Sequence, residues 1–91
     1  MNYSIVIEPE AQEDLYSIYD YIANNDSVAK ARNFIQELKA SIDSLSFMPQ
    51  RCRNSLYVND GKTKDLIYKG YTICYHIFDT SVHIVAIFRQ R

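Results

Sequence analysis

The stretch KGYTICYHIFDTSVHIVAIFRQR, residues 69–91, decides how this chain folds. It contains two runs rich in β-branched and aromatic residues, Tyr71 to Phe78 and Val82 to Phe88, separated by a short polar turn. A strand directs successive side chains to opposite faces of its sheet, and apolar residues occupy both parities of each run. The sequence therefore predicts a β-hairpin that is apolar on two faces.

Strict alternation assigns the hairpin side chains to faces. In the first run one face carries Tyr71, Ile73, Tyr75 and Ile77, and the other carries Thr72, Cys74, His76 and Phe78. In the second run one face carries Val82, Ile84, Ala86 and Phe88, and the other carries His83, Val85, Ile87 and Arg89. This assignment makes Tyr71 and Tyr75 core residues and places His83 on the same face as Arg89.

The first half of the chain carries two helical patterns. Ala11, Leu15, Ile18 and Ile22 recur at three- and four-residue spacing and predict a helix from about Pro9 to Ala23. A second apolar stripe, from Val28 to Leu45, predicts another helix that ends before Pro49. The turn between them, Asn24 to Ser27, is short, so we expect an antiparallel helical hairpin.

Short strands complete the pattern. We expect strands at Asn2 to Ile7, at Asp65 to Tyr68 and, briefly, at Ser55 to Val58, before the turn formed by residues 59–61. The predicted fold is α+β, in the order β-α-α-β-β-β: a two-layer sandwich with the helical hairpin packed on one face of an antiparallel sheet. We expect residues 1–91 to form a single domain.

The helices can cover only one face of this sheet, so the other face is predicted to be a docking surface. That face combines apolar residues with a rim of Lys64, His76, His83, Arg89 and Arg91. In the alternative interpretation, the first strand or a second copy in a homodimer covers it.

The composition of the chain narrows the class of protein and its expected cellular location. Apolar residues make up 47% and charged residues 23%, as in ordinary globular proteins, and no apolar run approaches the ~18 residues of a membrane span. The first residues lack the pattern of a secretory signal, so we expect a cytoplasmic protein without a membrane partner. Cys52 and Cys74 show no metal-ligand spacing, and we predict neither a metal site nor a cofactor.

The formal net charge of −1 conceals an asymmetry between the two halves. The segment up to Leu45 contains eight acidic and three basic residues, whereas the segment from Ser46 onward contains three acidic and seven basic residues. A basic second half favours an acidic or polyanionic partner on that side, and the alternative is chance variation in a small protein.

Taken in order, three segments resemble toxins of the RelE/ParE superfamily, the toxin half of bacterial type II toxin–antitoxin pairs. AQEDLYSIYDYIA is similar to the family's A-x-x-D-L-x-x-I-x-x-Y-I, and SLSFMPQRCR is similar to its L-x-x-x-P-x-x-x-R junction. KDLIYKGYTICYHIFDTSVHIVAIFRQR resembles its basic residue, turn, Y-x-I-x-Y-x-I strand and basic final strand. The resemblance spans nearly the whole chain and is closer to the ParE-like branch.

The resemblance implies a cognate antitoxin, part of which folds onto the toxin, with operator DNA contacted only through the complex. It favours the ParE-like function, in which the toxin arrests growth by binding DNA gyrase. Lys64 stands where that branch usually has an arginine, and Arg89 stands at its usual histidine position. The target- or antitoxin-binding residues predicted in this way are Lys62, Lys64, Lys69, His76, His83, Arg89 and Arg91.

Two alternatives stay open. The RNA-cleaving branch suggests a ribosome-dependent mRNA endoribonuclease, for which the catalytic residues would be Lys64, His83, Arg89 and Arg91. In that branch an arginine commonly follows the aromatic residue that opens the third strand, whereas Tyr71 is followed here by Thr72. The third hypothesis is a non-toxic interaction module that keeps the fold.

Overall fold

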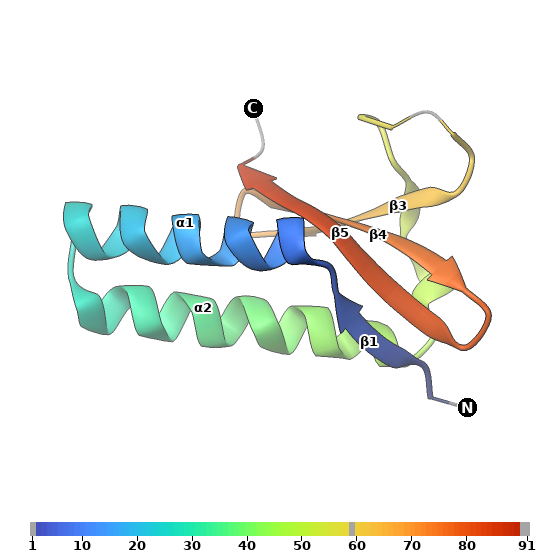
Figure 1. Ribbon diagram of the computed structural model, residues 1–91, viewed down its shortest axis with the longest axis horizontal. Helices are drawn as coiled ribbons and strands as arrows, with labels where there is room; N and C mark the ends of the chain where they lie inside the picture. Colours follow the sequence, from blue (N-terminus) through green and yellow to red (C-terminus); the bar gives the residue numbers. More distant parts are fainter. Residues whose placement is uncertain (1, 59, 90–91) are drawn as a thin grey trace.

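The computed structural model describes residues 2–58 and 60–89. Helices α1 (Pro9–Asn25) and α2 (Val28–Asp43) form a hairpin against one face of a five-stranded sheet (Figure 1). The strand order is β1-β5-β4-β3-β2. The strands are β1 (Ser4–Ile7), β2 (Arg53–Asn54), β3 (Thr63–Tyr68), β4 (Tyr71–Phe78) and β5 (Ser81–Arg89), and two short 3-10 helices, Ser44–Ser46 and Pro49–Arg51, connect α2 to β2. The predicted α+β fold is confirmed.

The helices begin where the sequence provides suitable residues. Pro9 occupies the first turn of α1, where its missing N–H costs no hydrogen bond. Ser27 caps α2, because its Oγ accepts a hydrogen bond from the backbone N–H of Lys30 at 3.1 Å. α1 continues two residues past the predicted end at Ala23, and α2 gives way at Ser44 to the 3-10 turn that carries Leu45.

One strand pairing departs from the predicted antiparallel sheet. β1 pairs in parallel with β5, from Ser4 opposite Ser81 to Ile7 opposite Ile84, whereas the other three strand pairs are antiparallel. Parallel neighbours require a long crossover connection, and the helical hairpin and the strands that follow it provide one. The pairing joins the two ends of the described chain, so no local sequence pattern specifies it.

Residues 55–58 form a loop rather than the predicted strand. The Oγ of Ser55 accepts hydrogen bonds from the backbone N–H groups of Tyr57 and Val58, at 3.1 and 3.0 Å. A local side-chain turn of this kind competes with strand pairing. The backbone N–H of Leu56 donates instead to the carboxylate of Asp65, at 3.2 Å. The short strand beside β3 is Arg53–Asn54.

A β-bulge changes the faces of the second half of β5. Cys74 pairs with Ala86 and Tyr75 pairs with Ile84, which leaves Val85 without a partner on β4. The extra residue reverses the alternation, so that Ile87 is buried against the helices. The predicted assignment of Ala86 to Arg89 is therefore wrong. Arg89 lies opposite Tyr71, and His83 lies opposite His76, on the other face of β4.

A carboxylate fastens α1 to the sheet next to this bulge. The backbone N–H of Ile87 donates to Oδ2 of Asp14 at 2.9 Å. β1 ends opposite Ile84, so beyond that point β5 has no strand neighbour on this side. Asp14 supplies the missing acceptor, which gives a structural reason for the aspartate in the AQEDL segment.

The core lies between the helices and the sheet. Its largest fully buried side chains include Leu15, Leu38, Ile42, Leu45, Ile73, Tyr75 and Ile84. The hydroxyl of Tyr75 donates to the carbonyl of Pro49 at 2.5 Å and so ties β4 to the junction after α2. Burial raises the pKa of the Tyr75 phenol far above its ordinary value. Tyr75 is therefore a core residue, as predicted.

Tyr75→Phe is expected to lower the free energy of unfolding by about 1–3 kcal/mol, because it leaves the Pro49 carbonyl without its donor. Urea denaturation followed by circular dichroism measures this change. Tyr16→Phe is the matched control, since that side chain is 64% exposed. Equal denaturation midpoints for the two variants would contradict the role assigned to the Tyr75 hydroxyl.

Candidate functional site

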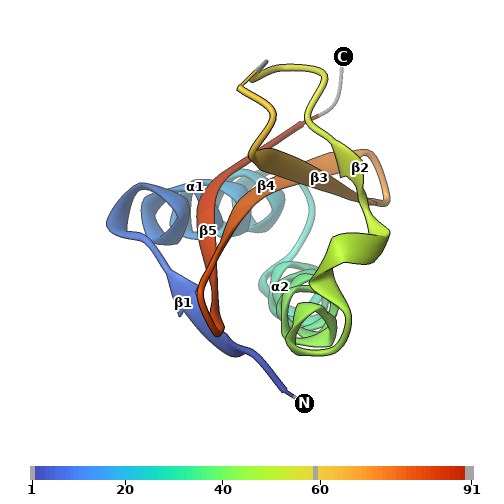
Figure 2. The ribbon, with the colours of Figure 1, turned by 90° about the vertical axis from the view of Figure 1, so that its right-hand side faces the viewer.

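The face of the sheet opposite the helices is covered over one half. The connection between β2 and β3 rises from the sheet (Figure 2), and the ring of Tyr57 packs edge-to-face on Phe88 with 4.9 Å between centroids. Thr72 and Cys74, also on this face, are buried. The predicted docking surface is therefore smaller than the sequence suggested, because part of the chain's own loop occupies it.

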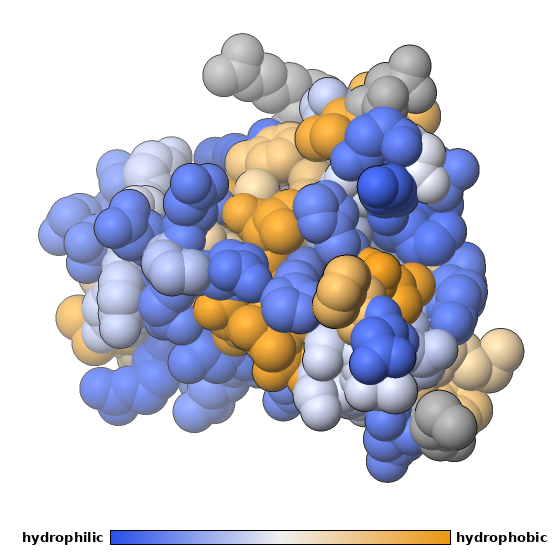
Figure 3. Space-filling model, turned by 45° about the vertical axis from the view of Figure 1, so that its right-hand side comes forward, coloured by the Kyte–Doolittle hydropathy of each residue, from blue (hydrophilic) through white to orange (hydrophobic). Residues whose placement is uncertain are grey.

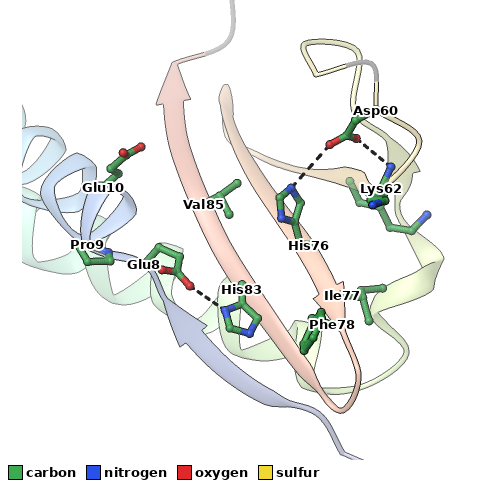
Figure 4. Close-up of a pocket in the computed structure, with 11 residues that line it drawn as sticks. Glu8, Pro9, Glu10, Asp60, Lys62, His76, Ile77, Phe78, His83 and Val85 are labelled. Atoms are coloured by element: carbon green, nitrogen blue, oxygen red, sulfur yellow. Dashed lines mark hydrogen bonds and ion pairs between the residues drawn. The ribbon is translucent and has the colours of Figure 1, made fainter.

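The uncovered half forms a groove of about 1020 Å³ (Figure 4). Its floor consists of His76 and Phe78 on β4 and of His83 and Val85 on β5, and Ile77, whose side chain packs toward the core, lines only its edge. One wall, at the start of α1, consists of Glu8, Pro9 and Glu10; the other consists of Asp60, Lys62 and Lys64. Apolar residues exposed among charged ones are also apparent on the surface in Figure 3. The most exposed apolar residue of the groove is Phe78, at 73%.

Each histidine of the floor is positioned by a neighbouring side chain: His83 by the carboxylate of Glu8 and His76 by the hydroxyl of Thr63. Nδ1 of His83 lies 2.7 Å from Oε1 of Glu8. Nε2 of His76 lies 2.7 Å from Oγ1 of Thr63 and 4.0 Å from Oδ2 of Asp60. The two histidines are opposite each other on β4 and β5. Such fixed imidazoles can transfer protons or present hydrogen bonds to a bound partner.

Asp60 organises the wall that contains the two lysines. Its carboxylate accepts from the backbone N–H groups of Thr63 and Lys62, at 2.8 and 2.9 Å, and from the hydroxyl of Thr63, at 2.9 Å. These bonds, led by that from the Thr63 N–H, lower the pKa of Asp60 to about 2. The ionised carboxylate therefore fixes the position of Lys62 at the rim of the groove.

Acidic groups outnumber ammonium groups in this groove. Among the residues that the structure describes, Glu8, Glu10 and Asp60 line it together with two lysines. The ammonium group of Lys64 is also engaged, since it donates to the carbonyl of Cys52 at 3.2 Å and to Oδ1 of Asn54 at 3.3 Å. Binding a phosphodiester backbone requires a positive field. The groove is suited to a partner of mixed charge rather than to a polyanion.

The structure brings four of the seven predicted site residues together: Lys62, Lys64, His76 and His83 line the groove. Lys69 lies in the β3–β4 turn and pairs with Glu37 of α2 at 2.8 Å; the hydrogen bond between them lowers the pKa of Glu37 and raises that of Lys69. Arg89 is exposed at the end of β5, opposite Tyr71. Arg91 lies outside the described residues.

Sequence reasoning missed the acidic residues of the groove. Glu8 ends the strand-to-helix junction and Asp60 stands in a turn, positions that are common for acidic residues in any protein. It also missed Asp65, whose side chain is completely buried and lies 3.9 Å from Arg53. The thiol of Cys74 donates a hydrogen bond to Asp65 at 3.3 Å. The pKa of this thiol is raised to about 12, mainly by burial and to a smaller extent by the neighbouring carboxylate. An acidic residue at the start of a predicted strand, directly before Leu66 and Ile67, was the available signal.

Two further properties of the described residues bear on other functions. Among residues 2–58 and 60–89, no three His, Cys, Asp or Glu side chains gather closely enough to hold a metal ion. Over the same ranges, neither helix combines the length and the apolar composition that crossing a bilayer requires.

The low pKa of Asp60 predicts an acid-sensitive loop. The pKa is lower in the folded chain than its ordinary value of 3.8, so ionised Asp60 stabilises the loop above about pH 4, and this contribution is lost as the pH falls through about 2. NMR titration of the Asp60 carboxyl carbon is expected to give a midpoint near 2. The backbone amide signals of Lys62 and Thr63 should shift with it in the wild type but not in Asp60→Ala. A midpoint near 4 would contradict these hydrogen bonds.

Comparison with known proteins identifies the family. A family model described as the ParE toxin of the type II toxin–antitoxin system parDE matches residues 5–91. The structure is similar to a chain of the chromosomal ParDE system from P. aeruginosa, with a TM-score of 0.85 and 16% identity over 98% of this chain and 97% of that one. It is also similar to a chain of the toxin–antitoxin complex RelBE2 from Mycobacterium tuberculosis, with a TM-score of 0.65 and 22% identity over 99% and 93% of the two chains. No curated protein sequence matches. Because the family model matches almost the entire chain, this protein belongs to the ParE toxin family of type II toxin–antitoxin systems.

Proposed function

We propose that this chain arrests growth in the bacterial cytoplasm by binding DNA gyrase, and that a cognate antitoxin neutralises it. Membership of the ParE family supports the toxin role. The two similar structures come from a toxin–antitoxin system and a toxin–antitoxin complex, which supports an antitoxin partner. We expect operator DNA to be contacted only through the toxin–antitoxin complex.

The observation that favours inhibition by binding over RNA cleavage is the burial of Thr72. This residue follows Tyr71, at the position where the RNA-cleaving branch commonly carries an arginine. Thr72 is completely buried, so its position is closed to a phosphate as well as uncharged. Cleavage of a phosphodiester needs cationic groups where charge develops in the transition state. The excess of carboxylates in the nearby groove adds to this argument.

One observation favours the second candidate function, a ribosome-dependent mRNA endoribonuclease. Glu8 holds His83 at 2.7 Å in a groove that Lys64 also lines, and a carboxylate that orients an imidazole is a common arrangement in acid–base catalysis. Arg89 lies on the other face of the sheet, away from these groups. Of the other two members of the predicted catalytic set, Arg89 does not lie beside this pair, and Arg91 is outside the described residues.

Induced expression of the chain in a bacterial host is expected to stop growth, and plasmid DNA from the arrested cells is expected to lose supercoiling. The purified chain should inhibit supercoiling by gyrase in vitro, and co-expression of the antitoxin should restore growth. Arrested cells with normally supercoiled plasmid would contradict gyrase as the target. New mRNA 5′ ends after induction would select the ribonuclease, whereas unimpaired growth would select the non-toxic module.

His83→Gln separates binding from catalysis. If the chain acts by binding gyrase, the concentration that half-inhibits supercoiling is expected to change by less than about tenfold, because loss of one interface contact rarely exceeds this. If His83 acts as a general acid or base in RNA cleavage, the variant loses about 10²–10⁴-fold in rate. His76→Gln is the matched variant on the neighbouring strand, and circular dichroism checks that both variants fold.

A further inference from the structure

We propose that the exposed Phe47–Met48 pair, which follows α2, is the apolar anchor through which this chain binds DNA gyrase. The identity of this partner rests on the proposed function, whereas the contact surface follows from the geometry of the segment. The pair lies in SLSFMPQRCR, and none of residues 44–51 lines the groove. Both residues are more than half exposed, at 60% for Phe47 and 57% for Met48.

Met48 has a backbone conformation that its side chain disfavours. Its φ is 50° and its ψ is 58°, in the left-handed helical region. The Cβ atom makes this region costly for residues other than glycine, asparagine and aspartate. Met48 also precedes Pro49, and a residue before proline is normally confined to extended conformations. The other described non-glycine residues with positive φ, Lys69 and Asp79, lie in tight β-hairpin turns, which favour it.

Contacts on both sides of Met48 impose this conformation. Nη1 of Arg51 donates to the carbonyl of Phe47 at 2.7 Å and to the carbonyl of Met48 at 3.2 Å. Pro49 is buried, and its carbonyl accepts the hydrogen bond from Tyr75. Unfavourable backbone conformations persist only where the surrounding structure fixes them in this way, and they are concentrated at functional sites.

The fold of the isolated chain does not require a methionine at this position. More than half of Met48 is exposed, so packing within the chain offsets little of the strain. Glycine would adopt the same conformation without strain. The geometry therefore indicates that the side chain acts outside the chain's own fold, as a fixed apolar projection that a partner can bind without first ordering it. Phe, Met and Arg are also residue types enriched at protein–protein interfaces.

The surroundings of the pair favour an apolar pocket on a protein over a bilayer or a nucleic acid. A surface that binds a bilayer needs a larger apolar face bordered by basic residues, whereas the nearby exposed residues of the chain include Asp43, Ser44 and Gln50. Nη1 of Arg51 is directed at three backbone carbonyls, so this donor is committed within the fold instead of to a phosphate. We therefore expect the pair to enter an apolar pocket on a gyrase subunit.

Met48→Gly separates binding from folding, because it removes the strain and the side chain together. The concentration of the full chain that half-inhibits gyrase supercoiling is expected to rise at least about tenfold, as for a central apolar anchor. The midpoint of urea denaturation is expected to stay the same or rise, since relief of strain offsets the backbone entropy that glycine adds to the unfolded chain. A purely structural role for Met48 would instead lower the midpoint.

Phe47→Ser and Tyr16→Ser are a matched pair of variants at two similarly exposed aromatic residues, at 60% and 64%. Phe47→Ser is expected to weaken inhibition at least about tenfold, and Tyr16→Ser, on α1, is expected to leave it within about threefold of the wild type. Binding of purified gyrase subunits to the immobilised full chain, measured by surface plasmon resonance, should weaken in parallel with inhibition. Equal losses in the two serine variants would overturn the proposal.

The remaining outcomes distinguish this inference from the proposed function. If the wild type inhibits gyrase and both Met48→Gly and Phe47→Ser inhibit it equally well, the anchor is overturned and the proposed function stands. If the wild type does not inhibit gyrase, both are overturned. Sedimentation of the purified chain tests a second copy as the occupant: a dimer that Met48→Gly dissociates, with inhibition unchanged, would also overturn the anchor.

Discussion

The bulge at Val85 is the constraint on which both faces of the sheet depend. Before it, Val82 and Ile84 face the helices; after it, Ile87 does so. The same shift turns Phe88 toward the ring of Tyr57, on the covered half of the opposite face. With regular alternation Ile87 would face away from the helices and Phe88 toward them. The bulge therefore lets one strand complete the core and also anchor the loop that closes half of the outer face.

That loop determines where the groove ends. Asp65 is buried beneath it and is held by the N–H of Leu56, the thiol of Cys74 and, at a longer distance, the guanidinium of Arg53. A buried carboxylate is costly unless such partners surround it. Because two of these partners lie in the segment 53–56 and the third lies on β4, Asp65 ties that segment to the sheet and specifies one position for the loop. The floor that stays open is accordingly limited to the end of the β4–β5 hairpin.

Local patterns in the sequence predicted the elements because helical and strand periodicities are local properties. The turn at Lys69-Gly70 was also recognisable, and both residues have the positive φ that a tight hairpin turn requires. The face assignment failed after Val85 because nothing in VHIVAIFR marks an unpaired residue. The parallel pairing of β1 and the wall formed by Glu8 depend on contacts between residues about 75 positions apart, and only the folded chain shows them. The predicted basic residues do not all lie at one site for the same reason: Lys69 pairs with Glu37 of α2, on the helix side of the sheet.

The arrangement of charge in the groove bears on both recognition and chemistry. A catalytic site must keep cationic and acid–base groups available to the reacting atoms. Here the ammonium group of Lys64 is engaged with Cys52 and Asn54, and one ring nitrogen of each histidine is fixed by a neighbouring side chain. Engaged side chains lose little further freedom when a partner binds, so the floor is preorganised and the cost of association is reduced. A partner that becomes ordered on binding bears that entropic cost itself, and a large apolar anchor among its contacts offsets the cost best. Phe78, exposed at the edge of this rigid floor, has the size and position for that contact.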